Sequence, residues 1–119
     1  MKQNRQLAIY LDDLRPLPEG FDILYTTGEE LISYLNAHKG LHINKISFDH
    51  DLGEGIMTGY DVVKELVDLI ADGWVTVDEC YFHTANPTGF NNMVKYLQGA
   101  RKHGVIPNTV YISTQFKGF

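Results

Sequence analysis

Two kinds of hydrophobic pattern alternate along this chain. Short apolar runs predict buried strands, and they cover residues 7–11, 21–25, 43–48, 77–82 and 109–113. Between the later runs, apolar residues recur at every third or fourth position, which predicts helices. These helices follow Thr27, Thr58 and Asn86 and end near residues 38, 73 and 103. Strands that alternate with helices in this way are typical of an α/β fold with a mainly parallel sheet.

Capping signals mark the start of each predicted helix. Two starts match the capping box, and the third combines an N-cap asparagine with a proline at the first helical position. The pairs are Thr27 with Glu30, Thr58 with Asp61, and Asn86 with Pro87. Between the first two strands, residues 14–20 contain two prolines, which exclude a helix there. Residues 114–119 are too few to form another packed helix after the last strand.

Polar side chains directly follow three of the predicted strands. They are Asp12 and Asp13 after the first strand, Asp49, His50 and Asp51 after the third, and His83 and Thr84 after the fourth. The carboxyl ends of parallel strands lie at one edge of the sheet, where ligands bind in open α/β folds. Buried carboxylates also cost free energy unless a cation or several donors meet them. We therefore expect these side chains to form one polar site.

The composition limits the classes of function open to this protein. With 119 residues, 44% hydrophobic and 21% charged, the chain has the make-up of one folded domain, residues 1–119. Its net charge of −5 argues against an extended nucleic-acid surface, but a small phosphorylated ligand or an RNA end is compatible with it. The single cysteine, Cys80, allows neither a disulfide framework nor a thiolate zinc site, and we expect it in the core.

Membrane and export signals are not apparent in the sequence. The first residues are polar, and no long apolar stretch follows them. We therefore expect no signal peptide, no membrane span and a cytoplasmic location.

The aspartates indicate a metal site. Carboxylates crowded at one place repel one another, and a hard divalent cation such as Mg²⁺ or Mn²⁺ relieves that repulsion. Asp12, Asp13 and Asp49 are the expected ligands. A metal held by them would clamp phosphate oxygens and offset the charge that develops in phosphoryl transfer. The simpler alternative, for a single aspartate such as Asp13 or Asp51, is that it caps a turn.

The strand-end histidines are the candidates for acid–base catalysis. His50 and His83 carry imidazole groups, which titrate near neutral pH without a large perturbation. Asp51 would orient a histidine or join the metal ligands. A structural role is the alternative for either histidine taken alone.

Two further residues are suited to an anion. Arg15 can form a pair of hydrogen bonds with a phosphate, and Asn86 lies at a helix start, where donors and the positive end of the helix dipole meet. A solvated arginine and plain helix capping are the alternatives. A P-loop sequence is missing, and Tyr60 stands where an EF-hand that began at Asp49 would place its bidentate glutamate.

Several short sequences together resemble the receiver domain of response regulators, and more closely its cyclic-phosphate-processing branch. They are Leu11–Pro16, Ser47–Gly53, Thr58–Asp61 and His83–Gly89, continued by Asn92-Met93. The resemblance spans roughly residues 7–97. It implies a three-layer flavodoxin/receiver-like fold with a five-stranded sheet that lacks the first and last receiver helices.

The resemblance also implies roles for individual residues. In receiver domains, the positions of Asp12, Asp13 and Asp49 hold Mg²⁺ and accept a phosphoryl group, and the position of Thr84 senses it. The lysine that receivers carry after the last strand has no clear counterpart, and Lys117 is the only candidate.

The closer branch implies the processing of cyclic phosphates. The leading hypothesis is a metal-dependent phosphoesterase that hydrolyses a 2′,3′-cyclic RNA end or a cyclic nucleotide, with Arg15, Thr84 and Asn86 at the phosphate. His50 and His83, which are additional to ordinary receivers, favour this chemistry. A signalling module phosphorylated on Asp49, a binder that sequesters a nucleotide without turnover, and a metal-dependent nuclease are the alternatives.

Overall fold

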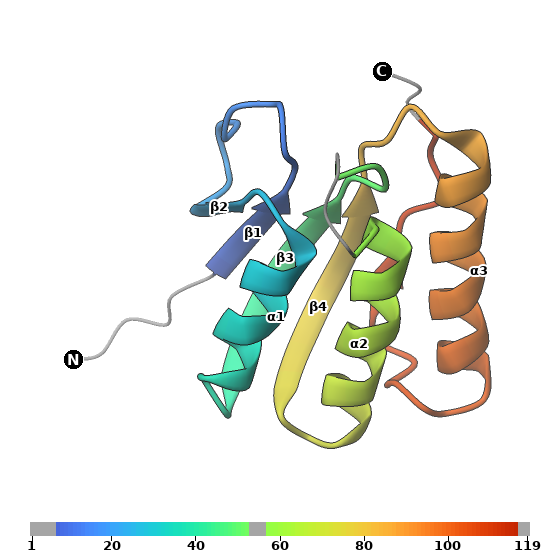
Figure 1. Ribbon diagram of the computed structural model, residues 1–119. Coiled ribbons are helices and arrows are strands. Elements are labelled where there is room, and N and C mark those ends of the chain that lie inside the picture. Colours follow the sequence, from blue (N-terminus) through green and yellow to red (C-terminus); the bar gives the residue numbers. More distant parts are fainter. Residues whose placement is uncertain (1–6, 53–56, 117–119) are drawn as a thin grey trace.

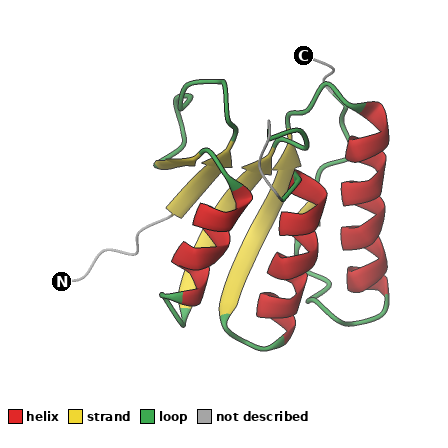
Figure 2. Cartoon of the chain, viewed as in Figure 1, coloured by secondary structure: helices red, strands yellow, loops and turns green. Residues whose placement is uncertain are grey.

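A computed structural model describes residues 7–52 and 57–116 of the chain. The described residues form a five-stranded sheet in the order β2-β1-β3-β4-β5, in which all neighbouring strands are parallel (Figures 1 and 2). The strands are β1 (Leu7–Leu11), β2 (Ile23–Tyr25), β3 (Leu41–Phe48), β4 (Val75–Phe82) and β5 (Tyr111–Ile112). Lys117 and residues 53–56 of the expected loop after β3 lie outside the described residues.

Helices follow β2, β3 and β4 in this part of the chain. They are α1 (Gly28–Asn36), α2 (Gly59–Ala71) and α3 (Pro87–Lys102). The predicted N-caps are confirmed, because the side chains of Thr27, Thr58 and Asn86 accept from backbone N–H groups of Glu30, Asp61 and Gly89. At α2 the capping box is complete, since the carboxylate of Asp61 accepts in turn from the backbone N–H of Thr58.

All three of these helices lie on one face of the sheet (Figure 1). The strand order explains this arrangement. Crossovers between parallel strands are right-handed, and the connections from β2 to β3, β3 to β4 and β4 to β5 all step across the sheet in the same direction. The connection from β1 to β2 crosses the sheet in the opposite direction, so a right-handed crossover there lies on the face opposite the three helices. There the chain is the proline-containing loop of residues 12–22, without a helix.

The predicted fold class is confirmed: the protein is an α/β receiver-like fold with a parallel five-stranded sheet. As expected, the described residues form no helix between β1 and β2 or after β5. The number of layers differs from the expected three, because helices cover only one face. A loop now occupies the connection that would have carried a helix on the second face.

The lengths of the strands follow from their pairing. β3 and β4 begin two residues earlier than predicted, because they pair along their whole length, from Leu41 opposite Val75 to Phe48 opposite Phe82. The edge strands β2 and β5 have one partner each and are shorter than predicted.

The hydrophobic core lies between the helices and the sheet. It includes the fully buried Ile9, Phe48, Leu66 and Leu97 from β1, β3, α2 and α3. Cys80 of β4 belongs to this core, as predicted, and burial raises the pKa of its thiol to about 12. Of the helices in the described ranges, none combines the length and apolar character needed to cross a membrane.

Candidate functional site

The three predicted metal ligands come together at the carboxyl edge of the sheet. Asp12 and Asp13 follow β1, and Asp49 follows the neighbouring strand β3. From β1 the chain runs to β2 on one side, whereas β3 lies on the other side, so the strand order reverses here. This is the position at which open α/β sheets bind ligands. One carboxylate oxygen from each aspartate lies within 4.8 Å of the other two.

Asp12 is held by donors on several sides. Its Oδ1 accepts from the backbone N–H groups of Leu14 and Arg15, at 2.8 and 2.9 Å. Its Oδ2 accepts from the Arg15 guanidinium at 2.9 Å and from the ring of His83 at 3.0 Å. Burial by itself would raise the pKa of Asp12, but these donors outweigh it and lower the pKa. The charged carboxylate is therefore fixed in place before any ligand arrives.

Asp49 lies in a less favourable environment. Burial raises the pKa of Asp49, and the negative charge of Asp12 raises it further. The backbone N–H of His50, at 2.8 Å, and the Thr84 hydroxyl donate to Asp49 and offset only part of this effect. Hard divalent cations such as Mg²⁺ and Mn²⁺ bind oxygen ligands, and the charge of such a cation would relieve the repulsion that remains between the carboxylates of Asp12 and Asp49. Asp12, Asp13 and Asp49 are therefore the group of described residues that could hold a metal ion.

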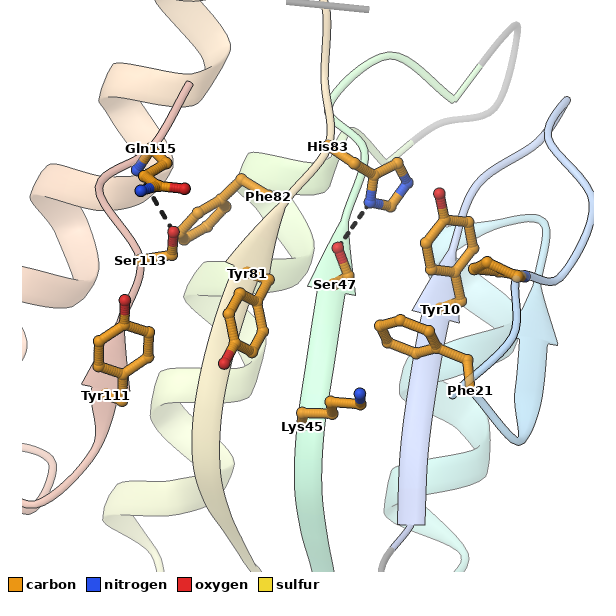
Figure 3. A pocket seen from close by; sticks show the side chains of 11 residues that line it. Tyr10, Phe21, Lys45, Ser47, Tyr81, Phe82, His83, Tyr111, Ser113 and Gln115 are labelled. Atoms are coloured by element: carbon orange, nitrogen blue, oxygen red, sulfur yellow. Dashed lines mark hydrogen bonds between the residues drawn. The ribbon is translucent and has the colours of Figure 1, made fainter. Parts of the chain in front are cut away.

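His83 is buried, and both of its ring nitrogens are engaged. Its Nε2 lies 3.0 Å from Asp12 Oδ2, and its Nδ1 lies 2.7 Å from Ser47 Oγ (Figure 3). Burial lowers the pKa of His83 to about 4, in spite of the nearby Asp12. The ring is therefore neutral at pH 7, and because a carboxylate only accepts, Nε2 carries the proton. Nδ1 then accepts from the Ser47 hydroxyl.

The hydroxyl of Ser47 is a functional group that the sequence analysis did not single out. The sequence did contain a signal for it, because successive side chains of a strand point to opposite faces of the sheet. Ser47 therefore lies on the opposite face from the buried Ile46 and Phe48. The parallel register sets Ser47 beside Tyr10 of β1, whose ring stacks on that of His83 at 4.1 Å. Both His83 and Ser47 thus lie on the sheet face away from the helices.

His50 lies on the other side of the sheet, at the start of α3. Its Nδ1 is 2.9 Å from Asp51 Oδ1, and the side-chain amide of Asn86 lies 3.3 Å from Asp51 Oδ2. Asn86 also caps α3 by accepting from Gly89 N–H at 2.9 Å. The structure therefore brings His50, Asp51 and Asn86 together, but it separates His50 from His83.

Two glycines permit this close packing. A Cβ on Gly89 would lie 2.3 Å from Cγ of the His50 ring, and a Cβ on Gly59 would lie 2.0 Å from the carbonyl oxygen of Asp49. The amide of Gly59 donates to the His50 carbonyl at 2.8 Å. The starts of α2 and α3 are thus packed directly against the segment that carries Asp49 and His50.

The remaining predicted residues also lie at this edge. One Arg15 nitrogen, Nη1, donates to Asp12 and to the backbone carbonyl of His83, each at 2.9 Å, and so joins the ends of β1 and β4. The Thr84 hydroxyl oxygen accepts from the backbone N–H of Asn86 at 3.1 Å, and the same hydroxyl donates to Asp49. Thr84 therefore connects the acidic cluster to the start of α3.

Comparison with known proteins gives one assignment. Residues 7–99 match the family model of the Cyclic-phosphate processing Receiver domain. Searches of curated proteins and of solved structures gave no significant match. The matched residues run from β1 into α3 and include every residue of the site described above. The chain therefore belongs to the cyclic-phosphate processing receiver domain family.

Proposed function

We propose that this protein is a metal-dependent phosphoesterase that hydrolyses a cyclic phosphate, either a 2′,3′-cyclic RNA end or a cyclic nucleotide. The observation that carries the proposal is the cluster of Asp12, Asp13 and Asp49 at the strand-order reversal, with an imidazole and a helix start beside it. The name of the family agrees with a cyclic phosphate as ligand.

The aspartates would hold Mg²⁺ or Mn²⁺. When bound, the cation supplies positive charge to the phosphate oxygens and to the attacking water. Asp12 and Asp49 would contribute to metal binding in different ways. Asp12 is already fixed by four donors, whereas Asp49 retains the unfavourable charge that a cation neutralises.

His50 is our choice for the residue that exchanges protons. Its pairing with Asp51 through Nδ1 orients the ring and makes Nε2 the nitrogen that accepts a proton from water. Hydroxide oxygen then bonds to phosphorus, one ester P–O bond of the ring breaks, and the departing alkoxide oxygen takes the proton back. The net change is the addition of one water to give a phosphomonoester.

His83 is better suited to positioning than to proton exchange. Both nitrogens are engaged, the residue is 4% exposed, and burial lowers the pKa of the ring to about 4. Its role in the proposal is to hold the Asp12 carboxylate in one orientation. The positive charge of Arg15, the Thr84 hydroxyl and the Asn86 helix start would attract the phosphate.

The test is a product analysis by mass spectrometry. Purified protein with Mg²⁺ or Mn²⁺ is incubated with a short RNA that ends in a 2′,3′-cyclic phosphate and with a panel of cyclic nucleotides. We expect a gain of one water on at least one substrate, lost in Asp49→Asn and in His50→Gln but kept in Asp78→Asn, an exposed aspartate on β4. Failure of every substrate with folded, metal-loaded protein would contradict the proposal; saturable stabilisation by a nucleotide without product would then indicate a binder.

One observation favours a second candidate, a signalling module phosphorylated on Asp49. The Thr84 hydroxyl already donates to the Asp49 carboxylate, so it would contact a phosphoryl group placed there. A small phosphodonor would then add one phosphoryl group to the protein mass, and Asp49→Asn would abolish the addition.

A further inference from the structure

A groove runs across the sheet face that the helices leave uncovered. Its volume is about 580 Å³, within the range of small-molecule sites. β3 and β4 form its floor, the end of the β1–β2 loop lies on one side, and the segment after β5 lies on the other (Figure 3). The lining side chains used below are Tyr10, Phe21, Lys45, Tyr81, His83 and Tyr111.

Aromatic rings dominate this groove. Tyr81 and Tyr111 lie side by side on β4 and β5, with ring centroids 5.7 Å apart, and Tyr111 is 51% exposed. The hydroxyl of Tyr81 donates to Glu79 at 2.8 Å, which holds the ring in place. Aromatic side chains presented on an open sheet provide stacking surfaces for nucleobases.

The charge of the groove suits an anionic ligand of limited length. Among the described residues that line the groove, Lys45 is the only lysine, arginine or carboxylate-bearing side chain, and it lies over the Phe21 ring at 4.7 Å. The chain as a whole carries a net charge of −5. One lysine in an acidic protein favours a single nucleotide over a polynucleotide strand, whose binding depends on several phosphate contacts.

The groove meets the acidic edge at His83. His83 lines its upper end and also contacts Asp12. The Tyr10 hydroxyl points the same way (Figure 3), and the Tyr10 ring stacks on that of His83 with the ring centroids 4.1 Å apart. Ser47, opposite Tyr81 in the sheet, precedes Asp49 by two residues, which is about 7 Å along the strand. A base that extends from a phosphate at the edge therefore meets Tyr81 first, since Tyr111 lies opposite Glu79, two residues further from the edge.

We propose that the substrate is a nucleoside cyclic phosphate whose base stacks on Tyr81 and Tyr111 while its phosphate lies at the three aspartates. This proposal rests on the proposed function for the phosphate end, but the base site stands on the groove itself. It restricts the substrate to single nucleosides and excludes cyclic phosphates without a base as good substrates.

Calorimetric titration with adenosine, in EDTA and without phosphate or metal, tests the base site alone. We expect saturable binding that weakens by at least about fivefold in Tyr111→Ala, since stacking on one aromatic ring contributes about 1–3 kcal/mol. Tyr111→Phe keeps the ring and should stay near wild type. Tyr34→Ala, a partly buried tyrosine on α1 that does not line the groove, is the matched control and should have no effect.

Three comparisons separate this inference from the proposed function. If adenosine fails to bind, or binds Tyr111→Ala as well as wild type, the base site is wrong even if cyclic phosphates are hydrolysed. Hydrolysis of glycerol 1,2-cyclic phosphate as fast as of adenosine 2′,3′-cyclic phosphate would also overturn it. Tyr111-dependent binding of adenosine in a protein that hydrolyses nothing would support the base site while the phosphoesterase activity fails. If the affinity of the protein for the ligand rises tenfold or more with each nucleotide added on the 5′ side, the proposal that the substrate is a single nucleoside would be contradicted.

Discussion

Asp12 and Asp49 are neighbouring carboxylates whose pKa values shift in opposite directions. Asp12 accepts four hydrogen bonds from donors that include Arg15 and His83, and these lower its pKa. Asp49 has fewer donors and experiences both burial and the charge of Asp12, and these raise its pKa. At the scale of single residues, the site therefore contains one carboxylate whose charge is stabilised in the folded protein and one whose charge is unfavourable there.

Amide substitutions at these two positions should have opposite effects on stability. We expect Asp49→Asn to stabilise the metal-free protein by about 0.5–2 kcal/mol, because it removes an unfavourable charge. Asp12→Asn should destabilise it by about 1–3 kcal/mol, because the amide presents N–H groups to donors. Urea unfolding followed by circular dichroism in EDTA measures both. Equal effects of the same sign would contradict the assigned environments.

Asp49→Asn also supplies a metal test. Mg²⁺ should raise the unfolding midpoint of the wild-type protein in a concentration-dependent way and have little effect on this variant. Asp78→Asn should respond like wild type.

The buried ring of His83 predicts a loss of stability in weak acid. Its pKa is about 4 in the folded protein against 6.5 for the free side chain, so between these values the unfolded chain binds more protons. The contribution of His83 to the free energy of unfolding is therefore fully present above about pH 6.5. It falls as the pH decreases towards 4, by as much as about 3 kcal/mol.

Unfolding midpoints in urea at pH values from 7.5 to 4.5 check this dependence. His83→Gln should have a lower midpoint at pH 7 but a flatter profile, and the exposed His103→Gln should keep the wild-type slope. If the unfolding midpoint of His83→Gln falls with decreasing pH as steeply as that of the wild type, other groups cause the acid sensitivity.

At the scale of elements, the starts of α2 and α3 shape the site. The capping residues could be predicted, because a cap is a local pattern of three or four residues, and Thr58 and Asn86 were recognised in this way. The reason for glycine at positions 59 and 89 could not be predicted. It depends on contacts with Asp49 and His50, which are distant in sequence from Gly89, and no local pattern reports such a contact.

Gly89→Ala should displace the His50 ring. A Cβ there would lie 2.3 Å from the ring, so the imidazole has to move, although the helical backbone itself accepts alanine. We expect any phosphoesterase kcat to fall by tenfold or more, because a misplacement of about 1 Å can cost a hundredfold. Stabilisation by Mg²⁺ should be retained.

Gly99→Ala, on the same helix with nothing near its Cβ position, is the control and should leave the activity unchanged. A Gly89→Ala protein of full activity would show that the orientation of His50 does not matter.

At the scale of the whole molecule, strand order decides most of the arrangement. The parallel sheet and its polar edge could be predicted, because alternating strands and helices have few solutions and each polar residue directly follows a strand. The separation of His50 from His83 could not be predicted, since it depends on the face of the sheet towards which each side chain points. The groove could not be predicted either, because its lining side chains come from separate segments of the chain that meet only in the folded sheet.

Cys80 should report on the integrity of the whole sheet. It lies in β4 at 0% exposure, and burial raises the pKa of its thiol to about 12, so the native protein presents almost no thiolate. Labelling by a disulfide reagent at pH 8 should be at least about a thousandfold slower than in urea-unfolded protein, since reaction requires opening of the core. Rapid labelling without urea would show that β4 separates from its neighbours locally.

The position of Trp74 has a practical consequence for optical work. Its ring nitrogen donates to the Leu35 carbonyl at 2.9 Å, and the residue precedes β4, whereas the acidic edge lies beyond the other end of that strand, about 25 Å away. Trp74 is the single tryptophan of the chain. Indole emission should therefore follow unfolding and remain constant when metal or nucleotide binds, while tyrosine emission should respond to an occupied groove. One sample thus carries two separate spectroscopic signals, one for folding and one for binding.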